Sequence, residues 1–288
     1  MKVIRSAHLL RAALHGGHHA HPTIALVPTM GAYHEGHLAL LRAAKRDHPQ
    51  VVVSLFVNPT QFNDPEDLAR YPRDLAGDMD KAAAAGCDIL FVPVVEEIYP
   101  PGFATRVEVG RIAEPFEGAH RPGHFTGVAT VVAKLFNIVS PDAAYFGMKD
   151  YQQTLVVRRL VADLNLGVEI VALPTVREPD GLAMSSRNQR LIPASRSRAS
   201  ALYRTLCACR DHLQTLAPGE PVAAALAAGR AALAAAGLTV DYFAAAHPDT
   251  LETVATADGP RVLLAAVDCD GVRLIDNVAV ACRRAGAG

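Results

Sequence analysis

The sequence predicts an α/β protein in which a mostly parallel sheet is followed by a smaller α+β domain. Three features lead to this prediction: short apolar runs without alternation, helical segments between them, and a change of composition after about residue 175. Strand–helix–strand order within one domain favours right-handed crossovers and parallel strands. We therefore expect a Rossmann-like domain over residues 1–175 and a smaller α+β domain over residues 176–288.

The N-terminal domain is expected to alternate strands and helices. TIALVP (23–28) is a β-branched run that ends at a turn. VVVSLFV (51–57) is apolar throughout, as is typical of a strand buried on both faces. Further strands are predicted at DILFVP (88–93), AAYFG (143–147) and VEIVALP (168–174), with helices at 35–47, 75–85, 123–140 and 151–165.

The C-terminal domain follows a polar loop, REPDGLAMSSRN (177–188), which we expect to act as a hinge. Two helical segments come next, and the second is very rich in alanine. Three strand-like runs complete the chain, so this domain is predicted to be α+β. The predicted helices span 193–216 and 219–236, and the predicted strands span 239–246, 261–267 and 271–278.

The composition excludes several classes of protein. The 288 residues include 28 Lys plus Arg and 29 Asp plus Glu, for a formal net charge of −1, and 50% are apolar. Such a chain is neither disordered nor a globally basic nucleic-acid coat. The start MKVIRSAHLLRAAL lacks the apolar core of a secretory signal, and the apolar runs are too short to span a membrane. We expect a soluble cytoplasmic protein that binds neither nucleic acid nor membranes.

Neither the cysteines nor an early histidine cluster predicts a metal or disulfide site. The five cysteines are scattered and odd in number, which indicates free thiols. Cys207 and Cys209 lie two apart in a helical pattern and therefore point apart, which favours a structural role. The tract HGGHHAHP (15–22) could hold a metal adventitiously, but it lacks a Cys or Glu at ligand spacing. We expect it to be a solvated loop.

The segment after the first predicted strand carries the strongest chemical signal. Ligands of an open parallel sheet bind beyond the carboxyl ends of its strands. Here that segment is PTMGAYHEGH (28–37), whose glycines let the backbone approach a ligand and whose end starts a helix. His34 and His37 would project from one side of the first turn. Either histidine alone is more simply a cap or a surface residue, but the pair with both glycines favours polyphosphate oxygens.

Amides and carboxylates follow at other positions near this edge. Asn58 and Gln61 come after the second strand, and their amides can both donate to and accept from a small hydroxy acid. Taken alone, the Asn-Pro pair there is an ordinary turn signal. Asp78 and Asp80 fall in a predicted helix facing this region, where either could receive Mg²⁺ through water. Most helical carboxylates are merely solvated.

Positive charge is supplied from two further places. Lys149 follows another strand-like run and is a point charge suited to phosphate, while Asp150 beside it is equally a helix N-cap. Ser185, Ser186 and Arg187 in the polar loop form either a mobile phosphate clamp or a serine cap. If these segments converge, they can neutralise a triphosphate and a carboxylate. From the residues alone, we expect an ATP-using transferase or ligase.

Five ordered stretches resemble the pantothenate synthetase (pantoate–β-alanine ligase) family, whose superfamily is named for its His-x-Gly-His motif. They lie in the family's order and spacing across most of 24–191. Tyr33 stands where a leucine is common, and Met148 where an acidic or amide residue is common. The stretches are PTMGAYHEGHLALLRAA (28–44), VVVSLFVNPTQF (51–62), YPRDLAGDMDKA (71–82), RPGHFTGVATVVAKLFNIVSPDAAYFGMKDYQQ (121–153) and DGLAMSSRNQRL (180–191).

The resemblance implies a two-step reaction. The carboxylate of pantoate attacks the α-phosphate of ATP, which releases pyrophosphate and leaves pantoyl adenylate. The amine of β-alanine then attacks the acyl carbon and gives pantothenate and AMP. The implied ligands are ATP, Mg²⁺, pantoate and β-alanine. The implied assembly is a homodimer built through the N-terminal domain.

The resemblance also implies roles for individual residues. His37 is the implied proton donor, and Asp78 matches the acid associated with magnesium. Gln61 would contact both pantoate and β-alanine, and Gln153 would hold pantoate. Neighbouring positions are Asn58, Tyr71, Arg121 and His124. Of these, we also expect Asn58 to bind substrate. The expected catalytic residues are His34, His37, Lys149 and Arg187. The expected ATP-binding residues are Met30, Gly31, Ala32, Tyr33, His34, Glu35, Gly36, His37, Gly147, Met148, Lys149, Asp150, Val176, Met184, Ser185, Ser186 and Arg187.

Three rival functions are less consistent with these residues. A nucleotidylyltransferase acting on a phosphate-bearing substrate would need more Arg or Lys where this chain has amides. A class I aminoacyl-tRNA synthetase would need a tRNA-binding surface, which a net charge of −1 disfavours. A nucleotide sensor without catalysis should have lost a charged ligand, yet His34, His37, Lys149 and Arg187 are all present.

Overall fold

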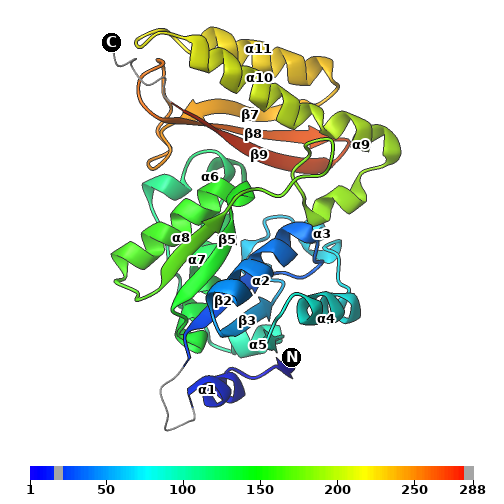
Figure 1. Cartoon of the computed structure of the whole chain (residues 1–288), viewed down its shortest axis with the longest axis vertical. Coiled ribbons are helices and arrows are strands. Elements are labelled where there is room, and N and C mark those ends of the chain that lie inside the picture. Colours follow the sequence, from blue (N-terminus) through cyan, green and yellow to red (C-terminus); the bar gives the residue numbers. More distant parts are fainter. Residues whose placement is uncertain (16–21, 282–288) are drawn as a thin grey trace. The chain divides into compact units, whose positions relative to one another are not determined.

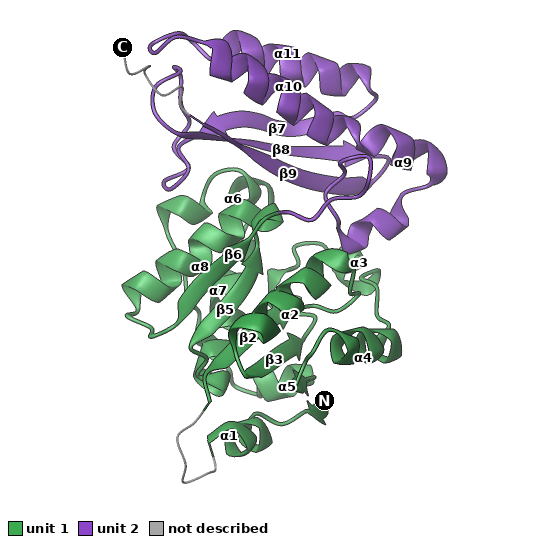
Figure 2. Cartoon of the chain, viewed as in Figure 1, with its two compact units in different colours: residues 1–174 green, residues 175–288 purple. Residues whose placement is uncertain are grey.

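The computed structural model describes residues 1–15 and 22–281, and the chain divides into two compact units, residues 1–174 and 175–288 (Figures 1 and 2). Among the histidines of the early cluster, only His15 belongs to the described residues. No helix in residues 1–15 and 22–281 is long and apolar enough to cross a membrane. Each unit has a sheet and a core of its own.

Unit 1 contains a six-stranded sheet in the order β1-β4-β3-β2-β5-β6, and all of its neighbouring strands run parallel. The chain leaves β2 toward β3 on one side and reaches β5 on the other, so the strand order reverses beside β2. Ligand sites form at such a switch point. This sheet confirms the predicted α/β fold. The strands are β1 (Lys2–Ile4), β2 (Ile24–Thr29), β3 (Gln50–Leu55), β4 (Ile89–Phe91), β5 (Ala143–Gly147) and β6 (Glu169–Leu173).

Helices cover both faces of the sheet of unit 1 (Figure 1). Leu26 and Val52 face a core shared with α1, α7 and α8, while Val27 and Val53 face α2 and α4. Burial on both sides explains why the strands lack alternation. The helices are α1 (Ala7–His15), α2 (Glu35–Asp47), α4 (Leu75–Ala84), α7 (His124–Val139) and α8 (Tyr151–Asp163). Shorter elements are η1 (Pro59–Gln61), α3 (Pro65–Ala69), α5 (Val95–Ile98), η2 (Arg111–Ala113), α6 (Glu117–His120) and η3 (Met148–Asp150).

Unit 2 is a three-stranded antiparallel sheet in the order β7-β8-β9, with α10 and α11 packed on one face (Figure 2). Gly229 of α11 lies against β7, because a Cβ at that position would come within 2.5 Å of the Phe243 ring. This small residue therefore sets how closely the alanine-rich helix approaches the sheet. The elements are η4 (Ser186–Arg190), α9 (Pro193–Ala199), α10 (Ala201–Thr215), α11 (Ala223–Ala235), β7 (Thr239–Ala246), β8 (Arg261–Cys269) and β9 (Val272–Val280).

Two predicted helices of unit 2 differ from the structure. The single helix expected over 193–216 is two helices, α9 and α10, which meet at Ser200. The helix expected from residue 219 begins at Ala223, because Ala217–Gly219 forms a turn in which Gly219 has φ +85°. Helical periodicity continues across both places, so the pattern did not reveal either boundary.

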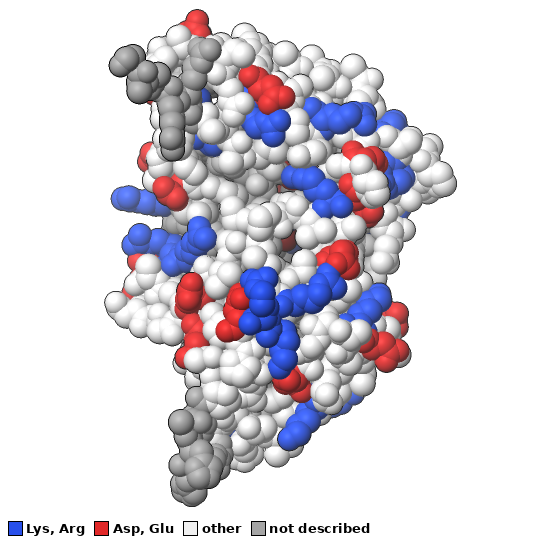
Figure 3. All heavy atoms as spheres, viewed as in Figure 1, with Lys and Arg blue, Asp and Glu red and all other residues white. Residues whose placement is uncertain are grey.

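A buried ion pair fastens the start of unit 2 to its own sheet. Arg177 donates to both carboxylate oxygens of Asp276, at 2.6 and 3.0 Å, and its guanidinium stacks 3.6 Å from the Tyr203 ring centroid. The Asp276 side chain is only 1% exposed. On the face drawn in Figure 3, by contrast, Lys and Arg are interspersed with Asp and Glu at the surface. Ion pairs between such exposed side chains contribute little to the free energy of unfolding.

Candidate active site

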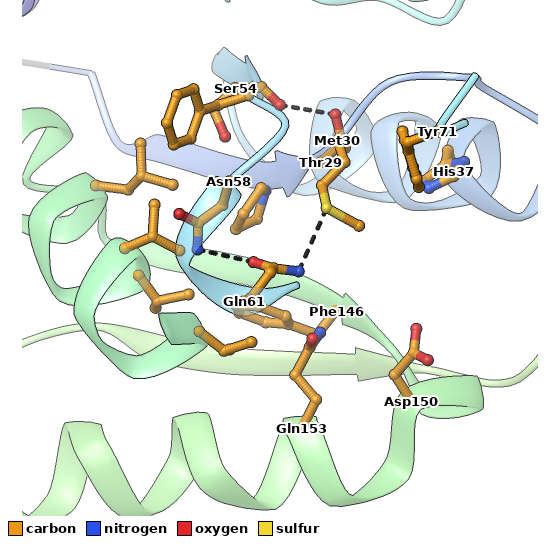
Figure 4. Close-up of a pocket in the computed structure, with 16 residues that line it drawn as sticks. Thr29, Met30, His37, Ser54, Asn58, Gln61, Tyr71, Phe146, Asp150 and Gln153 are labelled. Carbon is orange, nitrogen blue, oxygen red and sulfur yellow. Dashed lines mark hydrogen bonds between the residues drawn. The ribbon is translucent and has the colours of Figure 1, made fainter. Parts of the chain in front are cut away.

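One cavity of unit 1, of about 140 Å³, lies beyond the carboxyl ends of β2, β3 and β5 (Figure 4). Its lining comes from the last residues of these three strands, from segments that follow them, and from α7 and α8. Parallel strands end at the same edge of a sheet, which is why distant parts of the sequence meet here. The expected site residues that line it are Met30, His37, Asn58, Gln61, Tyr71, Asp150 and Gln153.

The loop after β2 is held by a buried carboxylate. Gly31 and Ala32 have φ of +82° and +53°, and the Ala32 and Tyr33 N–H groups donate to the two oxygens of Asp78, each at 2.7 Å. Asp78 is 2% exposed. Lys81, one turn further along α4, donates to the Tyr33 carbonyl at 3.0 Å. The direct contacts of Asp78 are thus to the loop itself.

His34 and His37 form a capping arrangement at the start of α2. His34 is the N-cap, and its Nδ1 accepts from the Gly36 N–H at 3.1 Å. The His34 N–H in turn reaches His37 Nδ1 at 3.4 Å, and the two ring centroids are 4.1 Å apart. The expectation that a histidine caps this helix is therefore met by His34, while the role of the pair toward a nucleotide stays a prediction. Glu35 in the same turn is exposed and pairs with Arg42.

Both imidazoles are neutral at neutral pH. Desolvation, followed by the electrostatic interaction with His34, lowers the pKa of His37 to about 3. Desolvation and then Lys149 lower the pKa of His34 to about 4. Since each Nδ1 accepts a hydrogen bond, the proton of each neutral ring belongs on Nε2. His37, which lines the cavity, is consequently an N–H donor through Nε2 and carries no positive charge.

Lys149 supplies the cationic group near these histidines. It lies in η3, directly after β5, and its Nζ is 3.2 Å from Asp150 Oδ1. Its side chain is 19% exposed, so solvent screens its charge only in part. Asp150 occupies the N-cap position of α8 without making a side-chain cap. Gly147 and Met148 complete the turn between β5 and α8.

A network of amides forms one side of the cavity. Asn58, which is 1% exposed, donates to Gln61 Oε1 at 2.9 Å and to the Gly127 carbonyl at 3.1 Å. The amide nitrogen of Gln61 points to Met30 Sδ at 3.3 Å (Figure 4). Sulfur is a weak acceptor, so this amide nitrogen remains available to a better one. Gly127 of α7 lies directly against the backbone of η1, because a Cβ at this position would lie 2.5 Å from the Thr60 carbonyl oxygen. The lack of a side chain thus permits α7 to approach η1 closely.

Arg121 and His124 lie just behind this network. Arg121 Nη2 donates to the Gln61 carbonyl at 3.2 Å, and His124 Nδ1 lies 2.8 Å from the same oxygen. Desolvation and then Arg121 lower the pKa of His124 to about 4. These two residues act on the backbone that carries Gln61, and neither lines the cavity.

The remaining lining was not anticipated from the sequence. Ser54, which is 1% exposed, faces the cavity, and its Oγ makes no hydrogen bond within the described chain. A lone polar residue inside VVVSLFV is the signal that could have revealed it. An apolar wall at helical spacing on α7, together with a residue from β5, also lines the cavity: Val128, Val131, Val132, Leu135 and Phe146.

The expected ATP-binding residues of unit 2 form a compact loop of their own. The Met184 N–H donates to the Val176 carbonyl at 3.0 Å, and Ser185 Oγ accepts from the Arg187 N–H at 3.3 Å. Ser185 is thus the cap of η4, which also contains Ser186. Their role toward a nucleotide stays a prediction.

Known proteins resemble this chain over nearly its whole length. A family model described as pantoate-beta-alanine ligase matches residues 2–279. The chain belongs to this family. A pantothenate synthetase of Cereibacter sphaeroides is 52% identical over 279 residues, which cover 96% of this chain and 99% of that protein. One of Acidiphilium cryptum is 53% identical over 283 residues, which cover 97% of this chain and all of that protein.

Solved structures lead to the same family. The crystal structure of pantothenate synthetase from Thermus thermophilus has a TM-score of 0.91 and 50% identity, and the match covers 97% of this chain and 99% of that one. A pantoate-beta-alanine ligase from Francisella tularensis, complexed with beta-gamma ATP and beta-alanine, has a TM-score of 0.82 and 34% identity, with 97% of each chain covered. The predicted family, fold and ligase function are therefore confirmed.

Proposed function

We propose that this chain joins pantoate to β-alanine through a pantoyl-adenylate intermediate and consumes ATP to AMP and pyrophosphate. The observation that carries this proposal is the shared cavity of unit 1. It is lined by His37, an amide network, an apolar wall and Asp150, and the cation of Lys149 contacts Asp150. These groups are suited to a nucleotide that reacts with a small hydroxy acid.

The first step needs charge neutralisation more than proton transfer. The pantoate carboxylate is ionised at neutral pH, so its oxygen can attack the α-phosphorus directly while the bond to pyrophosphate breaks. His37 Nε2–H and Lys149 Nζ are suited to donate hydrogen bonds to the phosphate oxygens that gain charge. Since His34 and His37 are neutral, Lys149 is the positively charged member of this group in unit 1. Approach of an anion also raises the pKa of both imidazoles.

Pantoate itself fits the two sides of the cavity. We propose that the amides of Asn58, Gln61 and Gln153 bind its carboxylate and hydroxyl groups, while its two methyl groups contact the valines of α7. In the second step, the β-alanine nitrogen attacks the acyl carbon, the bond to AMP breaks, and the amine loses its proton. Pantoyl adenylate is a reactive anhydride, so water must be kept out until the amine arrives.

Mg²⁺ would be held chiefly by the nucleotide. Within the described residues, no group of three or more His, Cys, Asp and Glu side chains is arranged as a metal site. Mg²⁺ often binds through one or two carboxylates plus phosphates and water, and Asp78 is the matching carboxylate. Because both of its oxygens already accept backbone N–H groups, this donor set fits a metal that arrives with ATP. Bound there, Mg²⁺ would neutralise phosphate charge.

We further propose that Met184 to Arg187 bind ATP, with Val176 contributing a backbone contact. From the family resemblance, we also propose a cytoplasmic homodimer built through unit 1. Light scattering should then give twice the 30.5 kDa of one chain. A mass of 30.5 kDa at micromolar concentration would contradict the dimer.

ATP–pyrophosphate exchange, measured with pantoate and without β-alanine, tests the adenylate step. We expect exchange that depends on pantoate, and Lys149→Met should slow it by about 100- to 1,000-fold. Arg158→Met, which removes an exposed cation from α8 of the same unit, is the matched control and should exchange at the wild-type rate. Exchange without pantoate, or a normal rate in Lys149→Met, would contradict the proposal.

A further inference from the structure

Unit 2 has a cavity of its own, of about 100 Å³, to which the ligase reaction assigns no role. Its walls are the carboxyl end of α10, with Leu213 and Leu216, the turn containing Asp258, and the first residue of β8, Arg261. The volume is a fraction of that of a typical small-molecule site and suits one small ion or a few waters.

Arg261 is buried in the wall of this cavity. It is 4% exposed and opens the central strand of the sheet, in register with Val280 of β9. Side chains alternate along a strand, so Arg261 shares a face with Leu263 and Ala265, which pack in the core under the helices. Its guanidinium therefore lies between the sheet and the end of α10.

The guanidinium of Arg261 has no partner among residues 1–15 and 22–281. Its Nε and Nη1 are both buried and form no hydrogen bond. Other arginines of unit 2 are paired, as Arg177 is with Asp276 and Arg273 is with Asp241. Arginine does not lose its proton in a protein, so this charge persists in a buried position. A buried charge is expected to be paired, so an anion in the cavity would supply the partner that the described residues do not.

We propose that Arg261 is the binding group of a small-oxyanion site in unit 2, which takes a phosphate or a short carboxylate. The planar guanidinium matches the geometry of both kinds of oxyanion. Apolar side chains of Leu213 and Leu216 limit access of water, which strengthens an ion pair inside the cavity. Asp258 lies exposed at the rim, where its Oδ1 accepts from the Gly219 N–H at 3.0 Å. Its negative charge therefore weakens the affinity without occupying the site.

NMR provides the direct test, because Gly259 lines the cavity. The chemical shift of its backbone amide is measured during titration with inorganic phosphate or with acetate. Saturating ATP is present throughout, so that phosphate sites of the nucleotide are filled. We expect a saturable shift with at least one of the two anions, and the stronger response identifies the source. No saturable shift with either anion would overturn the proposal and leave water as the partner of Arg261.

Variants provide the second readout. At an anion concentration ten times Kd, the wild-type protein should gain about 3 °C in midpoint temperature, and Arg261→Met should gain none. Arg204→Met, which removes an exposed arginine from α10, is the control and should respond as the wild type does. Asp258→Asn should bind the anion more tightly, because a like charge leaves the rim. An anion response that survives in Arg261→Met, or that is lost in Asp258→Asn, would refute the assignment.

Discussion

Substitution of Asp78 by asparagine should destabilise unit 1 even when no metal or nucleotide is present. The side chain keeps its shape but loses its charge, and one acceptor oxygen becomes an NH₂ donor that faces a backbone N–H. The native carboxylate receives two hydrogen bonds of 2.7 Å in a position that is 2% exposed. Hydrogen bonds to a charged group are each worth about 1.5–3 kcal/mol, and a buried unsatisfied donor costs about 1–3 kcal/mol. We expect Asp78→Asn to lower the free energy of unfolding by about 2–3 kcal/mol.

Urea denaturation in metal-free buffer measures this effect. Asp80→Asn is the matched control, because Asp80 lies two residues along the same helix and is exposed. The released loop should also raise the KM for ATP, and added Mg²⁺ should not restore it. If Asp78→Asn unfolds with the wild-type free energy and only its Mg²⁺ requirement changes, the carboxylate is a metal ligand and the anchoring argument is wrong.

Three further predictions follow from single contacts. Gly31→Ala forces φ +82° on a residue with a Cβ, and that Cβ would lie 2.8 Å from Asp78 Oδ2. The KM for ATP should therefore rise at least tenfold. Gly167→Ala is the control, because the space around Gly167 is open, and it should leave this KM unchanged. The pKa of His37 is lowered from 6.5 to about 3 in the folded chain, so the unfolded chain binds this proton more readily. The contribution of neutral His37 to the free energy of unfolding is therefore complete above about pH 6.5 and is lost as the pH falls toward 3. His37→Gln should therefore flatten the decline in unfolding free energy between pH 7 and pH 4. Asp276→Asn leaves Arg177 without its counter-charge and should cost about 3 kcal/mol, read by calorimetry; an unchanged transition would contradict this.

Unit 1 was largely predictable from the sequence because its strands are buried on both faces. A run such as Val51 to Val53, with every side chain at 0% exposure, has no alternation and cannot be mistaken for a surface strand. The first strand, Lys2–Ile4, was missed because three residues are too few to show a periodic pattern of apolar side chains. The break between α9 and α10 was missed because Ser200, with φ −64° and ψ −15°, keeps a helical backbone conformation and leaves the apolar spacing unchanged.

The candidate site was predictable where function follows directly after a strand. His34, His37, Asn58 and Lys149 all occupy such positions, and the sheet brings their segments to one edge. The contact between Asp78 and the loop after β2 joins residues more than forty apart and has no local signature. Burial, which the sequence does not contain, decides that the histidines are neutral.

The amphiphilic lining of the cavity in unit 1 has a consequence for handedness. Apolar carbon from α7, the amides around Gln61 and the donors near His37 are three chemically different surroundings, and Figure 4 shows His37 and Asn58 on opposite sides of the Gln61 amide. Such an enclosure is not superimposable on its mirror image. The wrong enantiomer of a hydroxy acid must turn its hydroxyl group toward valine or a methyl group toward an amide. At about 1–3 kcal/mol for a hydrogen bond left unmade, this chain should prefer one enantiomer by roughly 10- to 100-fold.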